Sequence, residues 1–386
     1  MPELNDYSGD FQPDLKLEDM SKDFLLKLAR HWQWSWMQLD SAWYDHVHDR
    51  FGIKTGFECD LNMWLRCAER CNTRYARIAG IPMKSAVDCL KALQLPIDNT
   101  MGALWPTESN IIDEHHVIIT VIRCPALEWC EKSAPERIVP MCRWLEPKVI
   151  DKYKVSMDVS LNPTKLPPRQ SQEEIACEWE YVTMYPEGPA RSKDEVVNET
   201  TDIPEVDDQT GPYYPNLTLE DFSKGFLIKL LNAWQYGWLV MNEGYYFEAK
   251  ARVGAEAAGE MELLAWNRMA EKVNRRYVKT ANVELNTVLD SLKLLQLPMN
   301  NALGFFPARY DIKSPNHVVM TISKGEAPDY LEGARPERTP PMYHAGGQGV
   351  LEKYLVNPKI KVTPLRVPPR NSSDDVDCEW ELKIES

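Results

Sequence analysis

The chain of 386 residues lacks the features that would place it in a membrane or on a nucleic acid. No stretch approaches the roughly 18 uncharged apolar residues that a membrane helix needs. The first residues are acidic and lack the basic and apolar regions of a signal peptide, so a cytoplasmic location is expected. Basic residues are outnumbered, and the net charge of -14 argues against sequence-independent binding to nucleic acid or to anionic lipid.

The common short motifs of nucleotide and hydrolase sites are also missing. The sequence has no phosphate-binding glycine loop, dinucleotide fingerprint, Gly-x-Ser-x-Gly elbow or His-Glu-x-x-His. The glycine-rich run at residues 346–349 is expected to be only a flexible loop. No Cys-x-x-Cys spacing supports zinc, and without a secretion signal the nine cysteines are expected to be reduced. We therefore expect a soluble globular protein, and its composition alone does not indicate a function.

A tandem duplication is what the sequence does contain. Residues 17–25 recur as residues 219–227, a shift of 202, and residues 177–180 recur as residues 378–381, a shift of 201. The same shifts pair many large side chains: Trp32 with Trp234, Trp36 with Trp238, Tyr44 with Tyr246, Trp64 with Trp266, and His116 with His317. We therefore expect a first copy at residues 1–186, a linker at 187–211 and a second copy at 212–386.

The linker is strongly acidic. It holds eight acidic residues against Arg191 and Lys193 and has no aromatic residue. Such a composition predicts an exposed and mobile tether.

Each copy reads as helices followed by strands. Apolar residues spaced by three and four predict helices over residues 17–50, 60–78 and 85–95. Runs rich in β-branched residues predict strands over 116–122, 149–159 and 177–183, and in the second copy over 317–323, 359–365 and 378–384. The fold class is α+β, with a small, mainly antiparallel sheet. The two copies are expected to pack about a pseudo-two-fold axis, in a monomer with internal pseudo-symmetry or in a homo-oligomer.

Cysteines are distributed unequally between the copies, because eight lie in the first copy and only Cys378 lies in the second. Cys124 and Cys142, with Cys130 between them and His116 upstream, are candidates for a thiol nucleophile or for metal ligands. Plain core packing is the alternative. A second pair, Cys67 and Cys71, lies four residues apart on one helix face and could hold a metal, but its apolar counterparts favour core packing.

The first predicted helix carries a carboxylate among aromatic residues. Asp40 lies near Trp36, Trp43 and Tyr44, and burial there would raise its pKa toward general acid–base use. A solvated acid on the helix surface is the alternative. Arg74, on the next helix, is expected to pair with a ligand carboxylate or with an internal acid such as Asp40.

The Pro-Pro-Arg sequences, at residues 167–169 and 368–370, are interpreted as rigid strand connectors with an exposed guanidinium.

These motifs together resemble a known family. The pattern consists of Trp36, Asp40, Trp43, Tyr44, Trp64 and Arg74 in the helical part, and Cys124, Cys142, Pro167-Pro168-Arg169 and Cys177-Glu178-Trp179 in the strand part. It is similar to the L-2-amino-thiazoline-4-carboxylic acid hydrolase-like family and to a neighbouring bacterial family of unknown function. The resemblance implies hydrolytic opening of a small ring, with cysteines and the helix-borne Asp40 near the site. The second copy has Asn242, Gly325 and Tyr343 at the positions of Asp40, Cys124 and Cys142, so it is expected to be silent.

The leading hypothesis is a hydrolase or hydratase that opens a small cyclic or heterocyclic molecule in a Trp-lined pocket. Its expected catalytic residues are Asp40, Cys124, Cys142 and His116, and its expected substrate-binding residues are Trp36, Trp43, Tyr44 and Arg74. The alternative is a non-catalytic protein that binds a small ligand, a haem-like cofactor or a metal, or that serves as an accessory subunit. A divalent metal stays an open alternative, and no other cofactor is identified.

Overall fold

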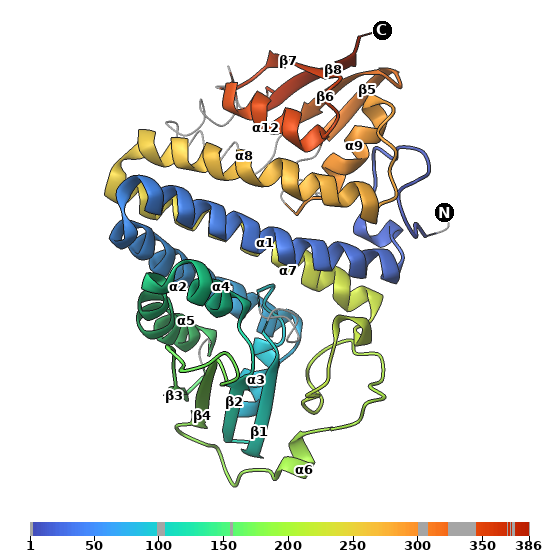
Figure 1. The fold of residues 1–386 in the computed structure, drawn as a ribbon. Coiled ribbons are helices and arrows are strands. Elements are labelled where there is room, and N and C mark those ends of the chain that lie inside the picture. The colour runs from blue at the N-terminus through green and yellow to red at the C-terminus, as the bar shows by residue number, and fades with distance from the viewer. Residues whose placement is uncertain are drawn as a thin grey trace. The chain divides into compact units, whose positions relative to one another are not determined.

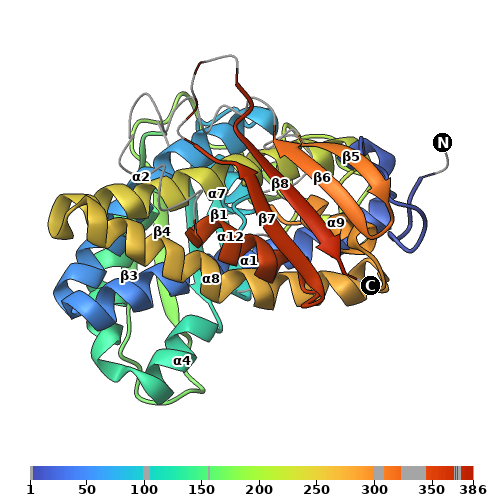
Figure 2. The same ribbon diagram turned by 90° about the horizontal axis from the view of Figure 1, so that it is seen from above.

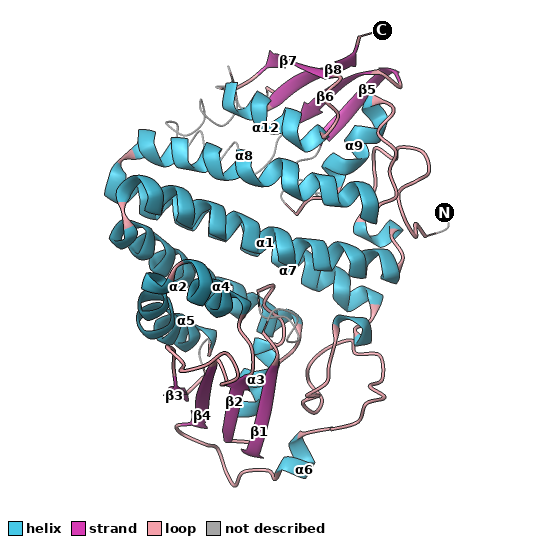
Figure 3. Ribbon diagram, viewed as in Figure 1, coloured by secondary structure: helices cyan, strands magenta, loops and turns pink. Residues whose placement is uncertain are grey.

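The computed structural model describes residues 3–98, 105–154, 157–299, 308–322, 345–368, 370, 372 and 375–385. In each copy long helices come first and a four-stranded antiparallel sheet follows (Figures 1 and 3). This order confirms the predicted α+β class and the antiparallel sheets. Among the described residues, every helix is too short or too polar to cross a lipid bilayer.

The two copies contain corresponding elements in the same order. The first copy contains α1 (Lys22–Phe51), α2 (Ile53–Ile78), α3 (Ala86–Leu93), β1 (Thr107–Asp113), β2 (His116–Val121), α4 (Pro125–Ser133), α5 (Glu146–Tyr153), β3 (Val159–Lys165) and β4 (Cys177–Thr183). The second copy contains α7 (Lys224–Val253), α8 (Ala255–Thr280), α9 (Val288–Gln296), β5 (Ala308–Ser314), β6 (His317–Ile322), α12 (Ala345–Leu355), β7 (Ile360–Arg366) and β8 (Cys378–Ile384). A short helix, α6 (Lys193–Val196), lies in the linker.

Matched residues begin and end the long helices. The Ser21 hydroxyl accepts a hydrogen bond from the Phe24 N–H at the start of α1, and Ser223 does the same for α7. Gly52 ends α1 with a φ of 87°, and Gly254 follows α7 with a φ of 88°. A positive φ of this size is strained for any residue with a Cβ, so both positions favour glycine.

The sheets have the same strand order, β1-β2-β4-β3 and β5-β6-β8-β7, and all neighbours are antiparallel. The edge strands β3 and β7 carry Pro163 and Pro364, each followed by an irregularity in the pairing. Proline has no backbone N–H to donate, so it is tolerated at an edge and discourages pairing with another chain.

The chain folds into two compact units whose boundaries differ from those of the repeats. The first unit combines Met1–Cys59 with Tyr245–Ser386, and the second unit is Asp60–Gly244. The boundaries therefore fall within α2 and within α7. Each unit joins the sheet of one copy to part of the long helices of the other copy.

In the first unit, α1 packs along α8, and α8 contacts α9 and α12, which lie between it and the sheet β5-β6-β8-β7 (Figures 1 and 2). The Trp32 indole in α1 donates a hydrogen bond to the Leu297 carbonyl at 2.9 Å. Arg276 of α8 places its guanidinium 3.7 Å from the centroid of the Trp34 ring. A helix of the first copy thus supplies core side chains to the domain of the second copy.

The second unit makes the reciprocal contacts. The Trp234 indole in α7 donates to the Leu95 carbonyl at 2.9 Å, and the Arg74 guanidinium lies 4.6 Å from the centroid of the Tyr236 ring. These pairs match those of the first unit at the repeat shift of 202. The predicted boundaries at residues 186 and 212 thus describe the repeat in sequence, whereas tertiary packing groups the elements differently. The pseudo-two-fold arrangement of the copies stays a prediction.

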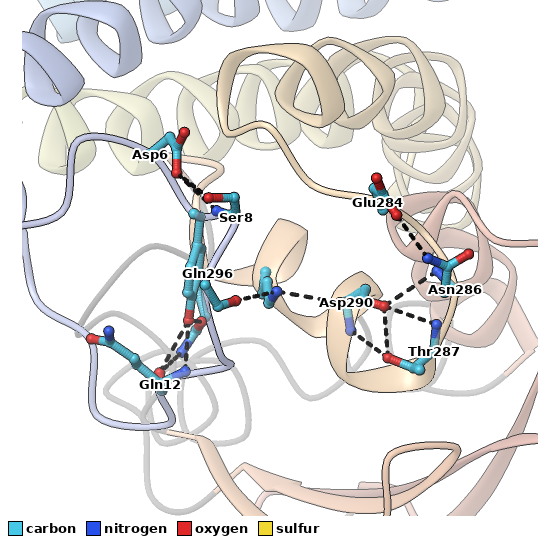
Figure 4. Close-up of polar contacts among 11 residues, drawn as sticks. Asp6, Ser8, Gln12, Glu284, Asn286, Thr287, Asp290 and Gln296 are labelled. Carbon is cyan, nitrogen blue, oxygen red and sulfur yellow. Dashed lines mark hydrogen bonds and ion pairs between the residues drawn. The ribbon is translucent and has the colours of Figure 1, made fainter.

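An extended N-terminal segment, residues 3–20, lies against α9 in the first unit and is held by a polar network (Figure 4). The Tyr7 hydroxyl donates to Gln296 Oε1 at 2.6 Å, and Gln296 Nε2 donates to the Gln12 carbonyl at 2.9 Å (Figure 4). The buried Lys293 ammonium donates to the Gly9 carbonyl and to Asp290 Oδ1. The matched residues of the second unit, Lys91 and Gln94, hold residues 211 and 214 by the same kind of bond.

The linker is mostly exposed, as its composition predicts, but it is attached to the second unit. Val196, Val206 and Gln209 are buried, and the Gln209 N–H donates to the Ala79 carbonyl at 2.7 Å. Val206 also forms a bridge with Phe222. The expectation of a free tether is therefore corrected: a few apolar side chains among the acids attach this segment to the folded unit.

Two local predictions are wrong. Residues 149–159 were predicted as one strand, but Val149 lies in helix α5 and the strand β3 begins only at Val159. The run at residues 346–349 lies within helix α12 rather than in a loop.

Candidate functional site

Asp40, which is partly exposed, and the buried Trp43 both contact Tyr245 in the first unit. Tyr245 donates a hydrogen bond from its hydroxyl to Asp40 Oδ1 at 2.8 Å. The rings of Trp43 and Tyr245 are stacked, with centroids 5.5 Å apart and planes at 3°, and neither ring is exposed. Asp40 therefore has a built-in donor, which favours a structural role and leaves the acid–base role a prediction.

The other aromatic residues of α1 are also part of the core. Trp36 is 1% exposed, and Tyr44 is 8% exposed and stacks on the His48 ring at 5.8 Å. Burial to this degree favours packing between helices over contact with a substrate. Their role as the lining of a substrate pocket stays a prediction.

Arg74 and His116 each have a partner that the sequence did not identify. Arg74 is exposed and lies over the Tyr236 ring in the second unit, whereas Asp40 belongs to the first unit. His116 Nε2 lies 2.9 Å from Glu180 Oε1 across neighbouring strands, and the same pair recurs as His317 and Glu381. Because both copies keep it, the His–Glu pair is best explained as part of the sheet surface.

The Pro-Pro-Arg sequence does not expose its guanidinium. The Arg169 side chain is 1% exposed and makes two hydrogen bonds to Glu131, at 2.8 and 3.0 Å. It also donates to the carbonyls of Gln172 and Glu174. The predicted exposed arginine is thus a buried anchor, because Glu131 on α4 compensates its charge. Of the second sequence, Pro369 lies outside the described residues.

Three cysteines of the first copy, Cys124, Cys130 and Cys142, come together in the second unit. Leu127, Cys130, Ile138 and Ala176 form a buried cluster, against which Val121, Cys124, Met141 and Cys142 pack. Cys124 is the N-cap of α4, where its sulfur accepts a long hydrogen bond from the Leu127 N–H at 3.4 Å. Cys142 lies in a π-helical turn, Pro140–Leu145, that leads into α5. Both residues are only partly buried, although burial is the main cause that raises the pKa of each thiol.

Glu146 is the functional candidate that the sequence reasoning missed. It is the first residue of α5, and burial raises its pKa to about 7. Burial and, to a smaller extent, the carboxylate of Glu146 together raise the pKa of Cys124 to about 12. The pKa values of Cys142 and Cys177 are raised by the same two causes. A carboxyl group with a pKa of about 7 thus interacts electrostatically with three thiols whose pKa values are raised.

Glu146 was missed because the strand prediction for residues 149–159 was wrong. A strand over residues 149–159 leaves Glu146 in a loop, whereas in the structure it begins helix α5 directly after the turn that carries Cys142. The available signal was Pro147, since proline is favoured in the first turn of a helix.

Large aromatic side chains are exposed in the segments that carry these cysteines. Trp129 in α4 is 50% exposed, and Trp144 in the π-helical turn is 54% exposed. The Arg137 guanidinium lies 5.3 Å from the centroid of the Trp129 ring. An aromatic surface with a cation is suited to a flat, polarised ligand.

The second copy lacks the central carboxylate. The residue that matches Glu146 is Gly347, in α12. The positions that match Cys124 and Cys142, Gly325 and Tyr343, lie outside the described residues. Any chemistry that needs this carboxylate is thus confined to the cluster around Glu146 in the second unit.

Metal binding gains no support from the described side chains, because no group of three or more His, Cys, Asp or Glu among them is arranged to hold an ion. Cys67 and Cys71 do approach each other, with sulfurs 3.6 Å apart, but they are buried in α2.

No protein-family profile, curated protein or solved structure matches the chain. The family resemblance drawn from the motifs therefore stays a prediction.

Proposed function

We propose that this protein is a hydrolase or hydratase that opens a small cyclic or heterocyclic molecule, with Glu146 as its general base. The supporting observation is that Cys124 and Cys142 pack against one cluster and that Glu146, at the start of α5, interacts electrostatically with both thiols. A general base works best when its pKa lies near the working pH, and the pKa of Glu146 is raised to about 7.

The raised thiol pKa values make Glu146 necessary for a cysteine mechanism. A thiol with a pKa of about 12 is protonated at neutral pH and is a weak nucleophile. Transfer of its proton to Glu146 costs at most about five pKa units, or about 7 kcal/mol, because the repulsion from ionised Glu146 disappears as it takes the proton. That cost fits within the barrier of about 14–17 kcal/mol of an enzyme with ordinary turnover. Glu146 can equally take a proton from an attacking water, in which case the thiols only line the site.

The test uses a panel of lactones, cyclic amides and thiazolines, with ring opening detected by mass spectrometry as the gain of one water. Glu146→Gln keeps the shape of the side chain and removes the proton acceptor. We expect it to lower kcat/KM by about 100-fold or more. Because the base must be ionised, kcat/KM of the natural protein rises with pH and levels off above about 7.

Matched variants separate the alternatives. Glu128→Gln changes the same residue type on α4, where the side chain pairs with Arg123, and should leave kcat/KM unchanged. Loss of activity in Cys124→Ala or Cys142→Ala identifies the nucleophile, whereas full activity in both assigns attack to water. Unchanged turnover in Glu146→Gln refutes the proposal. Binding of panel members without turnover would instead favour the non-catalytic alternative, for which the exposed Trp129 and Trp144 are the supporting observation.

A further inference from the structure

One edge of the sheet in the second unit is covered by the linker. Ser192 forms a bridge with Asp113 at the end of the edge strand β1, and α6 contacts the same strand. Val196 of α6 is 3% exposed, and Ile111 of β1 is 4% exposed. The linker segment thus shields the apolar side chain of an edge strand from water.

Backbone hydrogen bonds hold the linker in this position. The Tyr213 N–H donates to the Val196 carbonyl at 2.8 Å, and the Asn198 N–H donates to the Tyr213 carbonyl at 2.9 Å. At the other end, the Glu114 N–H donates to the Arg191 carbonyl, and the Arg191 guanidinium makes hydrogen bonds of 2.9 and 2.6 Å to the Glu114 carboxylate. The linker is therefore docked by isolated backbone bridges on either side of the helical turn α6, one to the end of β1 and one to Tyr213.

The first unit repeats the receiving surface. Its edge strand β5 matches β1, and Phe11 matches Tyr213. The Phe11 ring packs edge-on against Tyr310 at 5.0 Å, where Tyr213 bonds to Ser109 in the second unit. The Tyr7, Gln12 and Gln296 network next to Phe11 fixes the N-terminal segment, so this surface is preformed (Figure 4).

The linker segment that covers β1 has no counterpart over β5 among the described residues. Ile312, which matches Ile111, is 44% exposed rather than 4%. Within the part of the chain that the structure describes, no segment takes the place of residues 191–198 beside β5 or pairs with the backbone of Phe11. The first unit therefore presents to solvent an apolar edge that the second unit buries.

The charge of the β5 edge indicates what kind of peptide segment could bind there. The strand β1 carries Glu108 and Asp113, whereas β5 carries Arg309 and Lys313 with a single acid, Asp311. The strand β1 has a net charge of -2, whereas Arg309 leaves β5 with a net charge of +1 because Lys313 pairs with Asp311. An acidic segment complements it, as the linker itself is acidic.

We propose that the exposed β5 edge of the first unit docks an acidic peptide segment of a partner protein. An aliphatic side chain of the peptide covers Ile312, and its backbone pairs with Phe11, as Val196 and residues 196–198 do in the second unit. Pro315 stands where the second unit has Glu114, so neither the carboxylate nor the N–H that hold Arg191 is present. The docked peptide therefore needs no arginine at its start.

The probe is a fluorescein-labelled synthetic peptide of residues 192–200, titrated against the full chain and followed by fluorescence anisotropy. The natural linker is tethered at the β1 edge at a high effective concentration, so the free peptide is expected at the β5 edge. We expect saturable binding that weakens with added salt, because the attraction is partly between charges. A peptide that begins at residue 187 and includes Arg191 should bind no more than about twofold more tightly.

Variants on both sides test the assignment. Ile312→Asp should weaken binding by about tenfold or more, and so should Val196→Asp in the peptide, which leaves the protein untouched. Ile112→Asp is the matched control, since Ile112 is an exposed isoleucine at the β1 edge and is 49% exposed. Absence of saturable binding refutes the proposal. So does binding that survives Ile312→Asp, or binding that is lost only in Ile111→Asp, which would mean displacement of the natural linker.

Discussion

The buried pair of Asp98 and Tyr153 in the second unit should make stability depend on pH in a direction opposite to that of most carboxylates. The Tyr153 hydroxyl donates to Asp98 Oδ2 at 2.7 Å, and Asp98 is 4% exposed. Burial raises the pKa of Asp98 from 3.8 to about 6, although the hydrogen bond from Tyr153 lowers it. The perturbation that tests this is Asp98→Asn, which keeps an oxygen to accept the hydrogen bond and removes the charge.

The sign follows from proton uptake. Because the pKa is higher in the folded state, the folded chain holds this proton more tightly, and stability falls as pH rises from about 4 to about 6. A shift of about two pKa units corresponds to about 3 kcal/mol of the free energy of unfolding at neutral pH. Asp98→Asn removes this cost, and the second copy already has Asn300 at the matching position.

Urea unfolding from about pH 4.5 to about pH 7.5 measures the effect. The stability of Asp98→Asn relative to the natural protein should increase by about 2 kcal/mol over this range. Asp158→Asn, an exposed aspartate of the same unit, is the control and should show no such trend. A difference between Asp98→Asn and the natural protein that does not change with pH would refute the reasoning.

Two further predictions use the internal repeat as its own control. Trp32→Phe and Trp234→Phe each remove an indole hydrogen bond of 2.9 Å to a buried carbonyl, and each should lower the free energy of unfolding by about 2–3 kcal/mol in urea titrations. A large effect at one site alone would contradict the equivalence of the exchanged helices. Gly52→Ala and Gly254→Ala place a Cβ where nothing lies within 4 Å, so backbone strain at a φ near 87° is the expected cost. Calorimetry should show a loss of about 1–3 kcal/mol for each, and a loss below about 0.5 kcal/mol would show that the backbone relaxes.

Secondary structure could be predicted where the sequence pattern is long or strongly biased. Helices α1 and α2 show the period of a buried helical face over many turns, and the β-branched run at 116–122 gives β2. The edge strand β1 was missed because only Ile111 among its residues is buried, so it has no apolar alternation. The helix α5 was mistaken for a strand because Val149 and Ile150 are β-branched, although its buried residues Val149 and Tyr153 are spaced by four.

Only the cysteines of the candidate site could be predicted from the sequence. Cysteine asymmetry pointed to Cys124 and Cys142, and the structure does bring them together. Glu146 could not be identified from the sequence, because its raised pKa arises from burial, and burial is decided only by tertiary packing. Arg169 was expected at the surface for the opposite reason: its partner Glu131 lies 38 positions away in the chain.

The sequence by itself determined the duplication, the α+β class and the first copy as the place to look for chemistry. Those properties are recorded locally, in repeated residues, in the period of apolar side chains and in the count of cysteines. Tertiary structure alone decided that the copies exchange parts of their long helices, that the linker covers β1, that Ile312 of β5 is exposed, and that Glu146 acts electrostatically on the thiols. The physical reason is that the spacing of apolar residues shows which face of a helix or strand is buried. Which other element packs on that face depends on packing across the whole chain.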